Sequence, residues 1–339
     1  MTAITAPILA KVPQLRQLNI LNDLLTVANL VEACFADSLD AEGHRYIQQM
    51  RRAGKDSHFL RWATTAMDTV SMPLSGYVWE ENGEVVGNVS LIPFQQARKK
   101  VYLIANVAVR SDYRRQGIAR TLTATAMQHA RQRGATAIWL HTRDDNPAAE
   151  ALYTSLGFRE RARRTTWLAK PTRNISLNGS GIKVMVGEFP TITARQARDW
   201  PQQEAWLQRL YPEELAWYQP ISWLSFRPGL GPSLYRFFLD FETRQWAAWS
   251  NGQLLGVLAW QPTSGHADRL WAATSPEDGA PALTALLCHA RRALTWRPNL
   301  ALDFPANQVD EAIRSAGFQP RRTLIWMQAD ATAALDERR

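Results

Sequence analysis

A short run of basic and small residues has the composition of a phosphate-binding loop. It reads Arg-Arg-Gln-Gly-Ile-Ala over residues 114–119. Gly117 lets a ligand approach the backbone closely, because glycine has no side chain. We predict that a helix begins at the end of this run. The N-terminus of a helix offers unpaired N–H groups and a partial positive charge, and here two arginines precede it. We therefore predict that this loop holds an anionic phosphate group.

The residues on either side predict a strand before the loop and a helix after it. Val101, Ile104, Val107 and Val109 make residues 101–109 an apolar, β-branched run, which is typical of a buried strand. A turn follows at Ser111-Asp112. The helix is predicted to begin at Gly117, and its apolar residues recur at four-residue spacing along one face. These are Ile118, Leu122, Ala126 and Ala130.

Two motifs resemble those of the GNAT superfamily of N-acyltransferases. The pattern Arg114-x-x-Gly117-x-Ala119 after a Val-Ala-Val strand resembles the family's acyl-CoA signature. Residues 146–158, Asn-Pro-Ala-Ala-Glu-Ala-Leu-Tyr-Thr-Ser-Leu-Gly-Phe, resemble the family's second motif. Their order and spacing make a chance match unlikely, so the resemblance implies an acyl-CoA-binding enzyme.

The resemblance implies a set of residues that bind the cosubstrate, acetyl-CoA. In the family, the loop amides hold the CoA pyrophosphate and the strand splays apart to receive the pantetheine arm. Backbone N–H groups near Val107 and Val109 then bond the pantetheine amides and polarise the thioester carbonyl. The residues implied to bind acetyl-CoA are Val107, Ala108, Val109, Arg114, Arg115, Gln116, Gly117, Ile118, Ala119, Arg120, Asn146 and Tyr153.

Acyl transfer to an amine needs a base for the amine proton, a donor for the oxyanion and an acid for the departing thiolate. The resemblance implies direct transfer in a ternary complex and gives Tyr153 the place of the acid. A phenol with its ordinary pKa near 10 suits that role. The alternative is a helical tyrosine packed beside Leu152 and Leu156. Asn146 in turn is either a pantetheine ligand or a helix N-cap, or both.

The sequence leaves the identity of the base open. His141 lies twelve residues before Tyr153, where the related ribosomal-protein N-terminal acetyltransferases carry a glutamate. An imidazole can accept a proton at neutral pH, although His141 is also readable as a strand-end residue with a satisfied hydrogen bond. Asp144 and Asp145 are alternative carboxylates. Asn106 stands where other members carry glutamate, and because an amide cannot be a base, it would orient the acceptor, with a water chain taking the proton.

Bulk properties favour a basic protein of a reducing compartment. The chain has 339 residues, a net charge of +8, and only Cys34 and Cys288, which exclude a disulfide framework and a cysteine-based metal site. The charge suits an anionic ligand such as CoA. Neither a signal-peptide pattern nor an apolar stretch of membrane-spanning length occurs. We expect a cytoplasmic protein without a metal, a nucleic-acid partner or a membrane partner, and we leave a homodimer open.

The order of predicted elements indicates a mixed α/β fold repeated once. Asn22 is predicted to cap the first helix, and the Asn-Gly pair at 82–83 predicts a β-hairpin. A linker is predicted over residues 171–181. We therefore predict two tandem GNAT-like domains, a catalytic one over residues 1–172 and a degenerate one over residues 183–330.

The second half repeats the elements of the first without its chemistry. Gly256 takes the place of Gly87, and Phe318 takes that of Phe158. Residues 275–280, Ser-Pro-Glu-Asp-Gly-Ala, replace the basic loop, and their two carboxylates would repel a pyrophosphate. We expect this domain not to bind CoA in the usual way. It would instead be a scaffold that covers the acceptor site or mediates dimers.

The function predicted from these patterns is N-acetylation. An acetyl group would move from acetyl-CoA to a primary amine, which is either a small metabolite or a peptide N-terminus. The missing glutamate base favours an alternative of another class, a non-catalytic acyl-CoA-binding sensor or interaction module.

Overall fold

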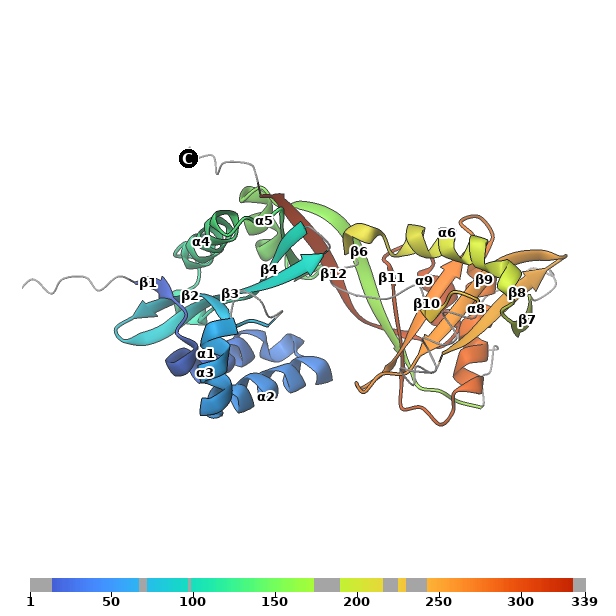
Figure 1. Ribbon diagram of the computed structural model, residues 1–339, viewed down its shortest axis with the longest axis horizontal. Helices are drawn as coiled ribbons and strands as arrows, with labels where there is room; N and C mark the ends of the chain where they lie inside the picture. The colour runs from blue at the N-terminus through green and yellow to red at the C-terminus, as the bar shows by residue number, and fades with distance from the viewer. Residues whose placement is uncertain are drawn as a thin grey trace, which may run out of the picture. The chain divides into compact units, whose positions relative to one another are not determined.

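The computed structural model describes most of the chain as two compact units (Figure 1). One unit takes the residues up to Thr142, together with Asn146–Glu160 and the chain from Met327 onward. The other takes Arg143–Asp145 and Arg161–Trp326. The mixed α/β class is confirmed, because each unit combines a mixed sheet with helices. The described residues are 14–66, 72–96, 99–173, 190–215, 225–229 and 243–331.

The first unit has the strand order β1-β2-β3-β4-β5-β12. Asn19 rather than the predicted Asn22 caps its first helix, and its side chain accepts a hydrogen bond from the Leu21 amide at 3.0 Å. The elements are β1 (Leu15–Gln17), α1 (Ile20–Phe35), α2 (Ala41–Lys55), α3 (Ser57–Ala66), β2 (Ser75–Glu81), β3 (Glu84–Gln96), β4 (Lys99–Val109), α4 (Ile118–Gln132), β5 (Ala137–Arg143), α5 (Pro147–Ser155) and the end of β12 (Gln319–Asp330).

Local sequence accounts for the β2–β3 hairpin and for the packing of α4 on the sheet. Asn82 and Gly83 have positive φ angles of 51° and 82°, the conformation that a two-residue hairpin turn requires. Gly87 on β3 lies directly under α4, and a Cβ atom there would come within 3.0 Å of Ile118 and 3.1 Å of Leu122. The helix therefore packs closely on the sheet, which fixes where its N-terminus lies.

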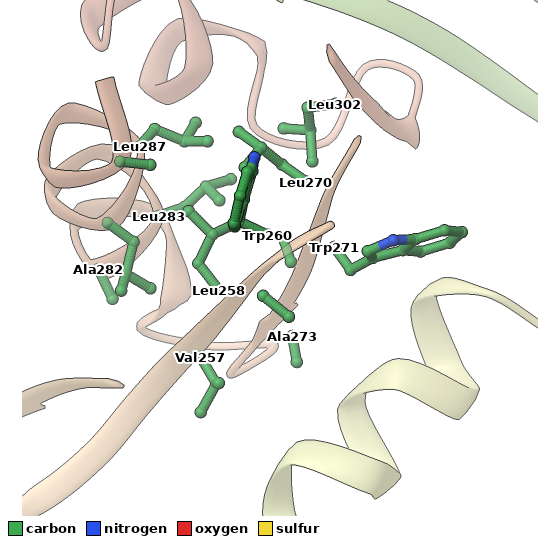
Figure 2. Packing of buried hydrophobic residues seen from close by; sticks show 14 of the residues in the cluster. Val257, Leu258, Trp260, Leu270, Trp271, Ala273, Ala282, Leu283, Leu287 and Leu302 are labelled. Atoms are coloured by element: carbon green, nitrogen blue, oxygen red, sulfur yellow. The ribbon is translucent and has the colours of Figure 1, made fainter. Parts of the chain in front are cut away.

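The second unit repeats this element order, with strands β12-β6-β11-β10-β9-β8-β7. Figure 2 shows Trp260 of β9 pointing toward α8 among Leu283, Leu287 and Leu270, while Trp271 of β10 points to the other face, toward α6. The elements are β6 (Arg159–Ala169), β7 (Thr191–Ala194), α6 (Trp200–Leu210), β8 (Arg244–Ser250), β9 (Gln253–Gln261), β10 (Asp268–Thr274), α8 (Gly279–Ala293), β11 (Leu300–Pro305), α9 (Asp310–Ser315) and most of β12.

The compact units do not follow the predicted boundaries at two strands. The sequence assigned β6 to the first domain, yet from Arg161 it belongs to the second unit, where Trp167 pairs with Leu302 of β11. Conversely, β12 returns from Met327 to the first unit, beside β5. Such pairings join residues far apart in the sequence, so local patterns do not reveal them. The predicted linker lies outside the described residues from residue 174 onward.

Within the described part of the chain, no helix combines the length and the apolar character that crossing a bilayer takes.

Ending the chain at Trp326 should destabilise the first unit. The deletion removes the neighbour of β5 and the buried side chains of Met327 and Ala329. We expect the unfolding midpoint to fall by roughly 5 °C or more, and the amides of β5 to exchange faster with deuterium. A chain ending at Ala331 is the control, because it keeps β12 whole. Equal melting and exchange in the two chains would contradict this assignment of β12.

Candidate functional site

The site is built where two parallel strands of the first unit separate. β4 and β5 pair at only three positions, from Val101 opposite Ala137 to Leu103 opposite Trp139. β4 then continues to Val109 without pairing to β5. Backbone N–H and C=O groups on this stretch face a gap in the sheet, and such groups need partners. A diverging strand pair can therefore receive an extended ligand that carries amides of its own.

The direction of the β4 amides follows from one hydrogen bond. The amide of Arg110, the residue after β4, donates to the Val86 carbonyl on β3 at 2.9 Å. Successive residues of a strand direct their backbone groups to alternate sides. The amides of Val107 and Val109 therefore point away from β3, toward the side from which β5 has diverged. These two residues are the ones predicted to meet the pantetheine arm.

The predicted phosphate loop ends at the N-terminus of α4. Gly117 is the N-cap residue, has a φ of 81°, and caps the helix with no side-chain hydrogen bond. The first helical bond runs from the Thr121 amide to the Gly117 carbonyl at 3.0 Å, so the amides of residues 118–120 lie beyond the helical ladder. Arg114, Arg115, Gln116 and Gly117 are exposed. This arrangement fits an anionic group such as a phosphate.

The predicted binding residues in this loop contribute mainly backbone. The Ile118 side chain is buried against Gly87, and that of Ala119 is half-buried. The Arg120 guanidinium donates to Ser155 Oγ at 2.6 Å. Arg114 turns inward and donates to the Val109 carbonyl at 3.0 Å. Arg115, at a positive φ of 66°, is also exposed and lies just before Gly117 and the free amides at the start of α4, which we call the phosphate cradle.

The end of β4 contains a bulge that the sequence analysis did not predict. The register between β3 and β4 shifts between Asn88 and Ser90, and Asn106 has a positive φ of 51°. The side chains of Asn88, Ser90 and Tyr46 gather around Asn106. Sequence analysis singled out Asn106 alone. The only signal for Asn88 in the sequence was that it and Ser90 are polar residues among the apolar ones of β3.

Tyr153 lies in α5 with 7% of its surface exposed, and its ring contacts Phe158 edge-on at a centroid distance of 6.1 Å. Burial raises the pKa of Tyr153 to about 12. The phenol is therefore protonated throughout the neutral range, which suits a proton donor and not a base. The packing alternative and the acid role are compatible, because burial itself keeps the proton in place.

Asn146 caps α5, with its Oδ1 accepting a hydrogen bond from the Ala149 amide at 3.1 Å. The capping interpretation is thus confirmed, while pantetheine binding stays a prediction. His141 is exposed and lies two residues beyond Trp139, on the part of β5 that has left β4. Asp145 is paired with Arg143 at 2.8 Å, and this partner lowers the pKa of its carboxyl. An ion-paired carboxylate of lowered pKa is a poor base.

The second unit also has two parallel strands that diverge, but a side chain of the same unit bonds an amide that faces the gap between them. β10 and β11 also pair at three positions, ending at Leu270 opposite Leu302. The Ser275 amide bonds to Leu255 as that of Arg110 does to Val86, so Ala272 takes the place of Val107. The Ala272 amide donates to the Tyr211 hydroxyl at 3.3 Å. The register of β9 and β10 has no bulge over this stretch.

The loop before α8 also differs from the phosphate cradle. Asp278 is its N-cap residue, at a φ of −113°, in place of a left-handed glycine. Gly279 packs so tightly that a Cβ atom there would lie 2.8 Å from Thr274 Cβ. Arg209 of α6 donates to the Thr274 carbonyl at 2.7 Å. These features support the prediction that the second unit does not bind CoA in the usual way.

Comparison with known proteins shows which protein family residues 35–158 resemble. Residues 35–158 match the family model described as acetyltransferase (GNAT) family. The [ribosomal protein bS18]-alanine N-acetyltransferase of Escherichia coli K12 is 47% identical over 55 residues, which are 16% of this chain and 37% of that protein. Human N-acetyltransferase 8 is 37% identical over 86 residues, 25% of this chain and 38% of that protein.

The chain thus matches little more than a third of the length of these curated relatives. A GCN5-related N-acetyltransferase from Sphaerobacter thermophilus aligns along the whole fold, with a TM-score of 0.53 and 13% identity over 96% of this chain and 99% of that one. This likeness shows the fold. The loop and the diverging strands lie within residues 35–158, the segment that is similar to the GNAT acetyltransferase family.

Proposed function

We propose that the first domain binds acetyl-CoA and transfers its acetyl group to a primary amine by direct transfer in a ternary complex. The observation that carries the proposal is the left-handed Gly117 at the uncapped start of α4, beside two diverging strands. The acceptor is a small metabolite or a peptide N-terminus. The activity of the bacterial relative, on an alanine of ribosomal protein bS18, supports the second class.

Backbone groups provide most of the binding in this proposal. The amides at the start of α4 hold the CoA pyrophosphate, with Arg115 supplying positive charge beside them. The amides of Val107 and Val109 bond the pantetheine arm and the thioester carbonyl. Because the corresponding amide of Ala272 already bonds Tyr211, we expect one acetyl-CoA per chain.

Two side chains carry the proton transfers in this proposal. The amine nitrogen attacks the thioester carbonyl carbon, a C–N bond forms, and the carbonyl oxygen becomes an oxyanion near the β4 amides. His141 takes the amine proton. The C–S bond then breaks, and the Tyr153 hydroxyl gives its proton to the departing thiolate. The products are the acetamide and CoA, and Tyr153 regains its proton readily because its pKa is about 12.

The proposal places the protein in the cytoplasm, which fits two free cysteines and the reducing conditions that keep them so. A non-catalytic acyl-CoA sensor is the second candidate. The observation that favours it is the amide of Asn106 on the strand where a carboxylate base would lie. The two candidates differ in one measurable respect, since a sensor forms no acetylated product.

Replacing Gly117 with valine should weaken acetyl-CoA binding at least about tenfold. A β-branched residue is strained at a φ of 81°, so the loop must shift, and the amides at the start of α4 would no longer point toward the pyrophosphate. No atom lies within 4 Å of a Cβ placed there, so the fold should survive. Calorimetric titration measures both the affinity and the expected stoichiometry of one.

Gly252→Val is the matched control. Gly252 has a φ of 75°, again with no atom within 4 Å of an added Cβ, and lies in the β8–β9 turn. This variant should bind acetyl-CoA as the unaltered chain does. Wild-type affinity in Gly117→Val would remove the loop from the site, and two acetyl-CoA molecules per chain would show that the second unit also binds.

Replacing Tyr153 with phenylalanine should lower kcat about 10²-fold, while the acetyl-CoA dissociation constant stays within about twofold. The ring and its contact with Phe158 remain, and only the donor is lost. In the unaltered enzyme, the donor stays protonated until the pH approaches about 12, so this group causes no loss of rate below about pH 11. Thiol release with a panel of amines gives the rates.

The control is Tyr77→Phe, which removes a hydroxyl that bonds His129 at 2.9 Å, away from the cradle. Should Tyr153→Phe turn over as fast as this control, Tyr153 is not the acid.

Replacing His141 with glutamine tests the base. An imidazole can accept the amine proton and a glutamine amide cannot, so His141→Gln should lower kcat at least about tenfold. An unchanged kcat would transfer the role to Asp144 or a water chain. No acetylated product from any amine would favour the sensor.

A further inference from the structure

Four uncharged polar side chains meet at the bulge of β4. Asn106 Nδ2 donates to the Tyr46 hydroxyl of α2 at 2.6 Å and to Ser90 Oγ of β3 at 3.1 Å. Asn88 Nδ2, also on β3, donates to the Asn106 carbonyl at 2.9 Å and to Ser90 Oγ at 3.4 Å. Asn88 and Ser90 are 0% and 1% exposed. We call these four residues the bulge network.

The network replaces the ladder bonds that the bulge breaks. Asn88 pairs with Ala108 and Ser90 pairs with Ala105, so two residues of β4 lie opposite one of β3. The side chain of Asn88 satisfies the Asn106 carbonyl that the interrupted ladder leaves behind. Asn106 itself tolerates the left-handed φ of 51° better than most residues do. Both asparagines therefore act on the backbone of the strand.

The hydrogen-bond inventory gives the Asn88 amide one orientation. Both Nδ2 hydrogens of Asn106 have acceptors, as do both of Asn88. Asn88 Oδ1 has no partner among the described residues, so the nitrogen fixes the orientation of this amide. Tyr46 ties the network to α2, and burial raises the pKa of its phenol, which keeps the hydroxyl neutral. The network is therefore uncharged.

The second unit shows what the strand does without the network. Val257 takes the place of Asn88, opposite Ala273, and β10 pairs with β9 without a bulge. The amide of Ala272, which faces the gap between β10 and β11, bonds a tyrosine of the same unit. The network and the bulge therefore occur together. Both are found on β4, whose Val107 amide faces the gap and is proposed to meet a ligand.

We propose that Asn88 and Asn106 are positioning residues for acyl transfer, which lock the bulge so that the Val107 amide faces the acyl carbonyl of acetyl-CoA. The inference rests on the proposed function. The inference goes beyond that function because it names the side chains that orient the Val107 amide toward the acyl carbonyl. These side chains, of Asn88 and Asn106, do not touch the acyl group themselves.

The test compares acetyl-CoA with CoA, which lacks the acyl carbonyl. If the Val107 amide bonds that carbonyl, the unaltered chain should bind acetyl-CoA about three- to tenfold more tightly than CoA, the effect of one ordinary hydrogen bond. Asn106→Gly keeps the left-handed backbone accessible and removes the amide. It should bring the ratio of the two dissociation constants toward one, with CoA affinity changed less than about twofold.

Ser90→Ala is the second variant. It deletes a single hydroxyl to which both amides donate, so it should fold and should lower the ratio as well. Asn82→Gly is the matched control, because Asn82 has the same φ of 51° but lies in the β2–β3 turn. It should keep the wild-type ratio. A merely structural role would weaken the binding of both compounds equally.

Calorimetric titrations of the full chain with acetyl-CoA and with CoA separate the outcomes. Loss of the acetyl-CoA preference in folded Asn106→Gly or Ser90→Ala supports the proposed positioning role. An unchanged preference in either folded variant overturns it. An unaltered chain that binds both compounds equally also overturns it and leaves acetyl-CoA binding in place. A chain that binds neither compound ends both this inference and the proposed function.

Discussion

The structure depends on backbone amides that lose their partners where two parallel strands diverge. A buried N–H group must find an acceptor, so a gap in a sheet has to be filled by something. In the first unit the strands separate after Leu103, and the bulge at Asn106 leaves the Val107 amide directed into the gap. The close packing of α4 over Gly87 sets the second group of unpaired amides beside it. A phosphate-bearing thioester with amides along its arm meets both requirements.

The second unit satisfies the same constraint from within. Tyr211 supplies an oxygen to the Ala272 amide and packs edge-on against Trp271 at 5.1 Å. Arg164 is 6% exposed, lies 4.9 Å from the ring centre of Tyr211, donates to the Leu210 carbonyl at 2.8 Å, and is paired with Asp303. Burial raises the pKa of Tyr211, so its hydroxyl stays neutral. The amide of Ala272 therefore has its acceptor within the second unit.

The sequence predicted what depends on residues close together in the chain. Gly117, the Asn82–Gly83 turn and the Asn146 cap were all found, because each is a local conformational requirement. The roles of β6 and β12 were not found, because their partners are set by tertiary packing between distant segments. The bulge network was missed for a related reason. Asn88 and Ser90 are two polar residues among the apolar ones in the middle of β3, and only the register of β3 against β4 shows that Asn88 bonds the carbonyl of Asn106.

The contact between Tyr211 and the Ala272 amide has an energetic reason. An amide left buried and unpaired costs about 1–3 kcal/mol, which is a large part of the stability of an ordinary domain. A repeat that lost only its phosphate loop would carry this cost at Ala272. The hydroxyl of Tyr211 removes this cost by bonding the amide that corresponds to Val107. Replacing residues 275–280 with the basic sequence of residues 114–119 would therefore not by itself give the second unit the proposed acyl site, since β10 would still lack a bulge and Ala272 would still be bonded to Tyr211.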